Sequence, residues 1–303
     1  MSLANIISRN RDNIAFIVGN GLNRYPNNPD AISWDHLLLR LWRRFAPEAY
    51  NSDRVPKGIT LTEFYDLLDL SNTTGDLAQP FGIQKEASRI MDDWNFRQHH
   101  QQFIAKAIEL DAPVLTTNFD MILPAAGNLN QFYTQSKPFT DFYPWTTYYG
   151  LRQHESPTDG FGVWYINGFV KYHRSIRLGL THYMGCVERA RDFLHKGENN
   201  PFNGKDQQHW RGHLTWLHII FNRDLCIFGI SLEENEVFIR WLLIERARYF
   251  KKFPERKKKG WYIAVASANE NGSLEGKKMF MRSVGLEYIE LDSYNEIYQK
   301  PWL

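Results

Sequence analysis

The feature that most constrains the fold is an apolar run at residues 13–18 that ends abruptly in Gly19-Asn20-Gly21, with a helical pattern beginning at Ser33. A buried strand that delivers two glycines to a turn can form a phosphate cradle, because a backbone without Cβ atoms approaches a pyrophosphate closely. The third glycine of the dinucleotide-binding pattern is missing, since Arg24 occupies its position. Two interpretations therefore stay open, a pyrophosphate cradle or a tight strand-exit turn without a ligand.

Short apolar runs alternate with helical patterns along most of the chain. Each run is apolar at most positions, as expected for strands covered on both faces of a parallel sheet. We therefore predict an α/β fold, with a Rossmann-like parallel sheet of about six strands and helices on both faces. The strands are expected at 13–18, 113–117, 162–166, 225–228, 261–266 and 287–291, with a further short strand at 176–180.

Helical patterns separate these runs, and two stretches stand apart from the alternation. The block at about 55–110 is predicted to be a helical insertion, and the aromatic stretch at about 127–160 a long loop insertion. No repeat or Pro/Ser-rich linker divides residues 1–303, so we expect a single domain. The helices are expected at 33–45, 60–70, 84–110, 121–126, 181–194, 210–221, 233–250 and 274–284.

Composition argues against several classes of protein. A net charge of +2 over 303 residues is too balanced to indicate nucleic-acid binding by itself. The two cysteines, Cys186 and Cys226, cannot form a four-cysteine zinc site, and we expect no metal. The apolar runs are far shorter than a membrane span, and residues 1–11 lack the apolar core of a secretory signal. We therefore expect a cytoplasmic protein without a membrane partner.

Polar residues and glycines follow four of the predicted strands. In parallel sheets, ligands bind outside the carboxyl ends of the strands, near the point where the strand order reverses. The order of the strands therefore predicts that four segments converge at one edge of the sheet: Gly19-Asn20-Gly21, Asn118-Phe119-Asp120, Asn167-Gly168 and Gly229-Ile230-Ser231.

These four segments, in this order, resemble the sirtuin-like (silent information regulator) domain. Gly19-Asn20-Gly21 stands where that family has Gly-Ala-Gly, and Thr116-Thr117-Asn118-Phe119-Asp120 matches its Thr-Gln-Asn-x-Asp segment. Gly229-Ile230-Ser231-Leu232 matches the Gly-Thr-Ser-Leu turn that holds the adenosine side of NAD. The strand at 261–266 with the polar turn at 267–271 fits the adenine-side loop, so the resemblance covers most of the chain.

Two departures from the family pattern refine the resemblance. Without a zinc ribbon, the chain is similar to the zinc-free bacterial branch of anti-phage defence, whose members hydrolyse NAD and do not deacetylate lysine. The family's catalytic histidine falls at Asn167, and asparagine cannot act as a general base near neutral pH. His173 is the nearest substitute, and it is expected either to take a catalytic role or to lie on an outward-facing turn.

The resemblance implies an NAD hydrolase, with NAD as substrate and nicotinamide and ADP-ribose as products, that depletes NAD during defence. Asn118, Asp120 and His173 are the candidate catalytic residues. Asn118 would position water or ribose hydroxyls, and Asp120 would bond the carboxamide and stabilise an oxocarbenium-like state. The candidate NAD-binding residues are Gly19, Asn20, Gly21, Asn23, Asn118, Asn167, Gly229 and Ser231.

The alternative function is a non-catalytic NAD- or ADP-ribose-binding subunit of a larger assembly, in which Asn167 marks lost turnover. Domains of the resembling type need an activating partner or assembly. The resemblance therefore implies a homo-oligomer, a separate activating partner such as a HerA-type ATPase, or both.

Structural explanations compete with several of these roles. Asn118 and Asp120 could serve only to cap the helix that follows, and Ser231 with Glu234 has the pattern of a capping box. His99 and His100 are expected on an exposed helix surface. We do not expect them to bind a metal, because adjacent helical residues point in different directions and no third ligand is near. The basic run at 256–259 is either a solvated loop or a contact for an anionic partner, and we do not expect direct nucleic-acid binding.

Overall fold

The computed structural model describes residues 2–72, 80–135, 143–266 and 272–303. Within these residues the structure is mixed α/β, with one eight-stranded sheet in the order β3-β4-β5-β2-β1-β6-β7-β8. The predicted fold class is confirmed. The strands are β1 (Ile14–Val18), β2 (Val114–Thr116), β3 (Asn130–Tyr133), β4 (Thr147–Gly150), β5 (Val163–Tyr165), β6 (Asp224–Phe228), β7 (Gly260–Val265) and β8 (Glu287–Leu291).

Six of the strands, in the order β5-β2-β1-β6-β7-β8, pair in parallel, and they are the six that the sequence predicts. Counted along the chain, this is the 3-2-1-4-5-6 order of dinucleotide-binding sheets. The chain starts at β1, builds outward through β2 and β5, and returns to the other side of β1 to add β6. The strand order therefore reverses between β1 and β6.

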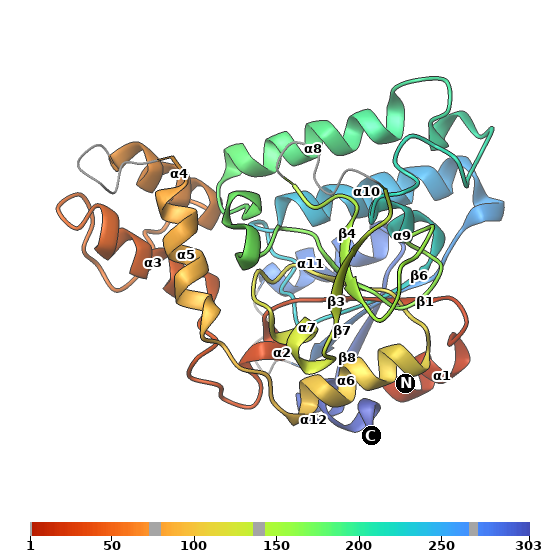
Figure 1. Cartoon of the computed structure of the whole chain (residues 1–303), viewed down its shortest axis with the longest axis horizontal. Helices are drawn as coiled ribbons and strands as arrows, with labels where there is room; N and C mark the ends of the chain where they lie inside the picture. Colours follow the sequence, from red (N-terminus) through yellow and green to blue (C-terminus); the bar gives the residue numbers. More distant parts are fainter. Residues whose placement is uncertain (1, 73–79, 136–142, 267–271) are drawn as a thin grey trace.

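Successive residues of the strands pack on opposite faces of the sheet. Ala15 and Ile17 of β1 face a core covered by one set of helices: α8 (Leu180–His195), α9 (Leu217–Asn222), α10 (Val237–Lys252) and α11 (Gly272–Ser283). Ile14, Phe16 and Val18 face a second core covered by another set: α1 (Leu3–Arg9), α6 (Gln98–Glu109), α7 (Ile122–Ala126) and α12 (Asn295–Tyr298). The two layers lie above and below the sheet in Figure 1.

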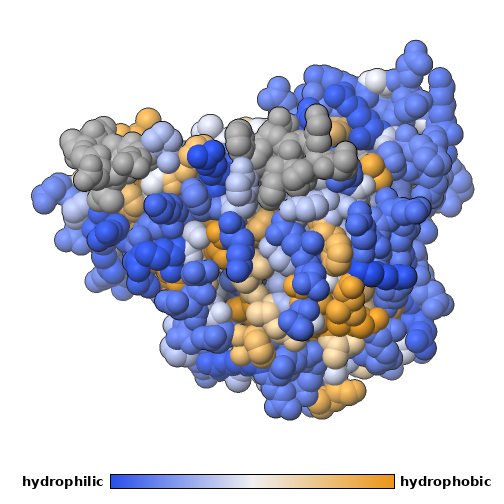
Figure 2. All heavy atoms as spheres, in the orientation of Figure 1, coloured by the Kyte–Doolittle hydropathy of each residue, from blue (hydrophilic) through white to orange (hydrophobic). Residues whose placement is uncertain are grey.

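Three helices form a lobe beside the sheet, at the left of Figure 1: α3 (Trp34–Phe45), α4 (Leu61–Ser71) and α5 (Gly82–Asp92). They share an apolar cluster in which Trp42 stacks on Phe64, with ring centroids 5.0 Å apart. Hydrophilic residues cover most of the surface seen in this view, over the lobe as well as over the sheet layers (Figure 2). None of the helices among the described residues combines the length and apolar character needed to cross a bilayer.

The helical region predicted at 84–110 is helical over most of its length, but it is divided into two helices, α5 and α6. Between them, the side-chain amide of Asn95 donates to the carbonyl of Asp93 at 3.0 Å, a local bond that competes with helical hydrogen bonds. The break lets α5 pack in the lobe while α6 covers the sheet.

Three further predictions differ from the structure. The aromatic stretch at 127–160 contains β3 and β4, which add an antiparallel hairpin to β5, while residues 136–142 lie outside the described part. The predicted strand at 176–180 is absent among the described residues, because Ile176 and Leu178 pack into the lobe cluster. The helix expected from residue 210 begins at Leu217, after a turn in which Thr215 Oγ1 donates to the carbonyl of Gly212 at 2.6 Å.

Candidate functional site

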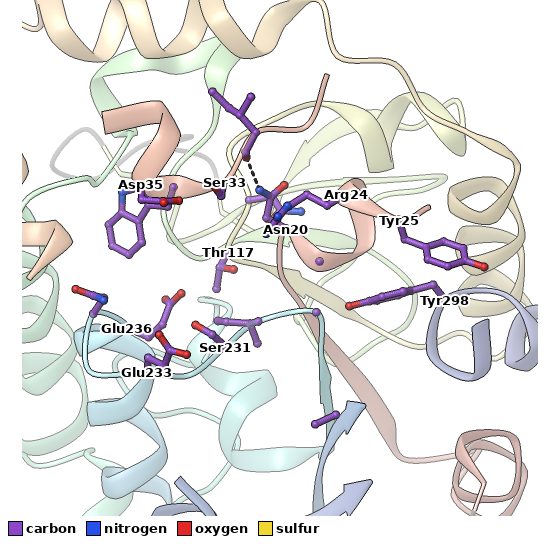
Figure 3. Close-up of a pocket in the computed structure, with 18 of the residues that line it drawn as sticks. Asn20, Arg24, Tyr25, Ser33, Asp35, Thr117, Ser231, Glu233, Glu236 and Tyr298 are labelled. Atoms are coloured by element: carbon purple, nitrogen blue, oxygen red, sulfur yellow. Dashed lines mark hydrogen bonds between the residues drawn. The ribbon is translucent and has the colours of Figure 1, made fainter. Parts of the chain in front are cut away.

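A cleft of about 1200 Å³ opens at the carboxyl edge of the sheet, where the strand order reverses. Figure 3 shows side chains from three strand exits around it, with Thr117 opposite Ser231 and Asn20 above them. The predicted convergence is confirmed, because all four predicted segments contribute to the lining. The contributing residues are Asn20, Gly21, Thr117, Asn118, Phe119, Asp120, Asn167, Gly229, Ile230 and Ser231.

The two glycines after β1 are required by the contact between two strand exits. The Gly19 N–H donates to the carbonyl of Phe228 at 3.2 Å, and the Gly21 N–H donates to the carbonyl of Gly229 at 2.7 Å. A Cβ atom would lie 2.6 Å from the Gly229 oxygen at Gly19, and 2.4 Å from the Tyr298 hydroxyl at Gly21. Both N–H groups therefore already have acceptors, which favours the tight-turn interpretation over a pyrophosphate cradle for these two amides.

Asn20 and Trp34 face the cleft from opposite ends of one segment. Asn20 precedes the short helix α2 (Gly21–Arg24), and its Nδ2 donates to the carbonyl of Ile32 at 2.7 Å (Figure 3). Asn20 Oδ1 and Trp34 Nε1 are both buried and have no hydrogen-bond partner among the described residues. Two lining residues close to the exit of β1 therefore each carry a buried polar atom without a partner, one acceptor and one donor.

Asn118 carries the clearest sign of a missing partner. Its side chain is 7% exposed, and its backbone N–H donates to Thr116 Oγ1 at 3.1 Å. The side-chain Nδ2 has no acceptor among the described residues, although Asn118 lines the cleft. Buried polar groups are almost always hydrogen-bonded, so this donor is suited to an acceptor supplied by a ligand.

Asp120 lies at the same strand exit but is held by the protein. It is 3% exposed; its Oδ1 accepts from the Ile122 N–H at 2.9 Å, and its Oδ2 accepts from Asn23 Nδ2 at 2.6 Å. The first bond satisfies an amide at the start of α7, so the helix-capping explanation is right for Asp120. Burial raises the pKa of Asp120 to about 6, although these hydrogen bonds oppose the rise.

Asn167, at which the resemblance would place a histidine, lines the cleft, and its Nδ2 donates to the carbonyl of Thr117 at 3.2 Å. This bond links the exits of β5 and β2. His173 lies in the 3-10 helix Val170–Ser175 and is not among the lining residues, and Gly19 and Asn23 do not line the cleft either. Within the described residues, no histidine lines the cleft.

The loop between β6 and α10 adds acidic residues that the sequence prediction missed. Glu233 and Glu236 line the cleft beside Ser231 (Figure 3), and Tyr262 Oη fixes this loop by donating to the carbonyl of Ile230 at 2.9 Å. Burial and the charge of Glu233 raise the pKa of Glu236 to about 7. The signal available in the sequence was an acidic residue directly before a helix, shortly after a Gly-x-Ser turn.

The capping box expected from Ser231 with Glu234 is wrong, because α10 begins at Val237 and its N-cap, Glu236, makes no side-chain cap. The exposed surface expected for His99 and His100 is also wrong, since both are buried. His99 Nε2 donates to the carbonyl of Leu22 at 2.9 Å, so α6 supports the helix that follows Gly21. Burial lowers the pKa of both, that of His100 to about 3.

The described residues contain no group of three or more His, Cys, Asp and Glu side chains arranged to hold a metal ion. The polar turn at 267–271, which the resemblance assigns to the adenine side, lies outside the described residues. The chain matches no known protein-family model and no curated protein.

Proposed function

We propose that the chain binds NAD in this cleft and hydrolyses the nicotinamide–ribose bond, releasing nicotinamide and ADP-ribose. The observation that carries the proposal is the buried, unpartnered Nδ2 of Asn118 in a cleft where the strand order of a Rossmann-like sheet reverses. Leaving such a donor unsatisfied costs about 1–3 kcal/mol, which a ligand acceptor would offset. The cleft volume of about 1200 Å³ exceeds that of typical drug-sized pockets and has room for a dinucleotide.

The reaction makes modest demands on the protein. The bond between ribose C1′ and the ring nitrogen breaks, and its electron pair neutralises the pyridinium of the departing nicotinamide. Asn118 Nδ2 would hold the incoming water or a ribose hydroxyl, and the Asp120 carboxylate would place negative charge near the developing cation. The water oxygen then bonds to C1′ and releases a proton.

We propose that Glu236 accepts this proton as the general base, because it lines the cleft and no histidine does so among the described residues. A general base works best when its pKa is close to the working pH, and the pKa of Glu236 is raised to about 7. The side chain of Glu236 makes no hydrogen bond to another described residue, so it is available to the water. His173 has no part in this mechanism, since it lies outside the cleft lining.

The second candidate function is a subunit that binds NAD or ADP-ribose without turnover. Two observations favour it: Asn167 stands where the resembling family has its histidine, and both oxygens of Asp120 already accept hydrogen bonds from the protein. In either case, the resemblance to defence domains supports the proposal that self-assembly or a separate partner, such as a HerA-type ATPase, controls the cleft. For the hydrolase, it also supports NAD depletion as the outcome.

Incubation with NAD separates these functions. The purified chain is assayed alone, at concentrations that promote self-association, and with a HerA-type ATPase, while chromatography follows nicotinamide and calorimetry follows ADP-ribose binding. The hydrolase predicts nicotinamide release that is lost in Asn118→Ala and kept in Asn51→Ala, a matched change at an exposed loop residue. ADP-ribose binding without release in any state supports the binding subunit. If ADP-ribose does not bind and nicotinamide is not released, both functions are wrong.

A further inference from the structure

A second cavity, of about 500 Å³, lies at the edge of the sheet opposite the cleft. It is lined by Asn13, directly before β1, by Arg223, directly before β6, and by Lys258, two residues before β7. These strands run parallel, so their amino ends share this edge. We propose that this cavity binds a small phosphoryl anion, a phosphate or pyrophosphate group, independently of any reaction in the cleft.

The cavity carries an excess of positive charge. Arg223, Arg256, Lys257 and Lys258 line it, and Glu255, whose Oε1 lies 3.2 Å from Arg256 Nε, is the one carboxylate among the described lining residues. The two lysines form no ion pair with another described residue. At least two ammonium groups are therefore available to an anion.

The charge of Arg223 is only partly offset. Its guanidinium donates to the carbonyls of Asp12 and Thr158, which are neutral groups. Burial lowers the pKa of Arg223, and the charges of Asp111, Asp159 and Asp224 oppose this change. None of these three carboxylates lines the cavity, so among the described lining residues only the carboxylate of Glu255, which pairs with Arg256, could compete with an anion.

His218 supplies a neutral donor whose tautomer the structure fixes. Its side chain is 1% exposed, and Trp210 Nε1 donates to its Nδ1 at 3.0 Å. An indole N–H can only donate, so Nδ1 must be unprotonated. Burial lowers the pKa of His218 to about 4, which leaves the ring neutral with its proton on Nε2. This Nε2–H has no acceptor among the described residues, and His218 lines the cavity.

These groups together match a phosphoryl anion. A fixed N–H donor combined with ammonium groups suits several oxygen acceptors around one centre, and lysine commonly binds phosphate as a point charge. A cavity of about 500 Å³ can enclose one or two phosphoryl groups. A nucleic-acid chain instead needs a track of positive charge that follows its backbone. The basic run at 256–259 is thereby assigned, in part, to an anion site.

The Trp210 indole offers a local measurement. When an anion accepts from His218 Nε2, the electron density at Nδ1 rises, and the hydrogen bond from Trp210 becomes stronger. We therefore expect a saturable downfield shift of the Trp210 indole proton when inorganic pyrophosphate is added at constant ionic strength. The protein is labelled with ¹⁵N-tryptophan, and Trp210→Phe identifies the resonance. Pyrophosphate that binds in the main cleft, at the other edge of the sheet, leaves this resonance unchanged.

Paired variants separate binding from charge screening. Lys257→Met/Lys258→Met should weaken the titration at least about tenfold, because hydrogen bonds to charged groups contribute about 1.5–3 kcal/mol. Lys57→Met/Lys251→Met removes the same charge from exposed positions outside the cavity and should change the affinity less than about twofold.

Three results would overturn the proposal: no saturable shift, an equal loss in both double variants, or a shift with a single-stranded oligonucleotide and none with pyrophosphate. The outcome does not depend on the proposed hydrolase. A chain that releases no nicotinamide can still show the Trp210 shift, and an active hydrolase can lack it.

Discussion

The side-chain amide of Asn23 donates a 2.6 Å hydrogen bond to the carboxylate of Asp120, joining the exits of β1 and β2 beneath the cleft. Asn23 is fully buried, and the other oxygen of Asp120 accepts from the Ile122 N–H. The carboxylate is thus held in one position by the protein alone. Its contribution to any ligand site is a fixed charge, and that charge depends on pH.

The free energy of unfolding should depend on pH because Asp120 is buried. Its folded pKa of about 6 lies above the ordinary 3.8, so the native state binds this proton more tightly than the unfolded state. The free energy of unfolding should therefore fall by up to about 3 kcal/mol as the pH rises from about 4 to about 6, and the contribution is then constant. Urea unfolding gives the free energy of unfolding of the wild type and of Asp120→Asn at each pH. The difference between the two values should change over this pH range.

Asp12→Asn provides the comparison for that experiment, because Asp12 is exposed. The difference in the free energy of unfolding between Asp12→Asn and the wild type should stay constant over the same pH range. A level difference for Asp120→Asn as well would show that Asp120 titrates at its ordinary pKa in the folded protein.

Gly21 should tolerate no side chain while Tyr298 keeps its hydroxyl. A Cβ at Gly21 would lie 2.4 Å from Tyr298 Oη and 2.9 Å from the backbone of Gly229, so Gly21→Ala should destabilise the fold by about 1–3 kcal/mol. Adding Tyr298→Phe should recover part of this loss in thermal unfolding. A Cβ added at Gly276 in α11 would have no atom within 4 Å outside the adjacent backbone of its own helix, so Gly276→Ala should instead stabilise the fold by about 0.5–1 kcal/mol. If the stability changes of Gly21→Ala and Tyr298→Phe simply add up in the double variant, the alanine Cβ does not meet the Tyr298 hydroxyl and the prediction is wrong.

Trp34 should matter for binding more than for folding. Its Nε1 has no partner among the described residues, and Trp34→Phe retains an aromatic ring for the edge contact with Tyr183. We expect stability within about 0.5 kcal/mol of the wild type, with ADP-ribose affinity about three- to tenfold lower. Trp42→Phe is the control, the same substitution at a tryptophan whose indole N–H has a partner. Trp42 Nε1 donates to the carbonyl of Phe64 at 3.0 Å in the lobe. Trp42→Phe should lower stability by about 1 kcal/mol and leave calorimetric binding unchanged.

Glu236 should control the pH dependence of the proposed hydrolysis. With a pKa raised to about 7, it becomes a competent base as the pH rises through neutrality, so kcat of the wild type should increase over that range. Glu236→Gln should lower kcat by about 10²-fold and flatten the profile, with little change in KM. Glu233→Gln removes the neighbouring carboxylate of the same cleft and should keep the rise, shifted to lower pH. Equal losses of kcat in the two variants would remove Glu236 from the mechanism.

The six parallel strands and their meeting edge were predictable because both follow from local signals. An apolar run ending in polar residues identifies each strand, and the topology of parallel sheets brings the exits of β1, β2, β5 and β6 together. The hairpin of β3 and β4 was missed because its aromatic residues lie on an edge of the sheet and show no clear alternation with turn signals.

Other features depended on partners that are distant in the sequence. The need for glycine at position 21 comes from Gly229 and Tyr298, and the burial of His99 comes from its bond to Leu22. The position of His173 outside the cleft depends on the 3-10 helix that carries it. No local pattern indicates such contacts. The polar residues at the strand exits were therefore predictable, but which of them face the cleft and which hold the structure was not.

The contact between Gly21 and Gly229 also determines when a ligand site can exist during the life of the molecule. Ribosomes deliver chains at roughly 5–20 residues per second, so β1 leaves the tunnel long before β6 can pair with it. Until that pairing occurs, the residues after β6 that line the cleft together with Asn118 are not in place. A polypeptide released early, before Gly229, should not bind any ligand of the cleft, because one side of the cleft would be missing.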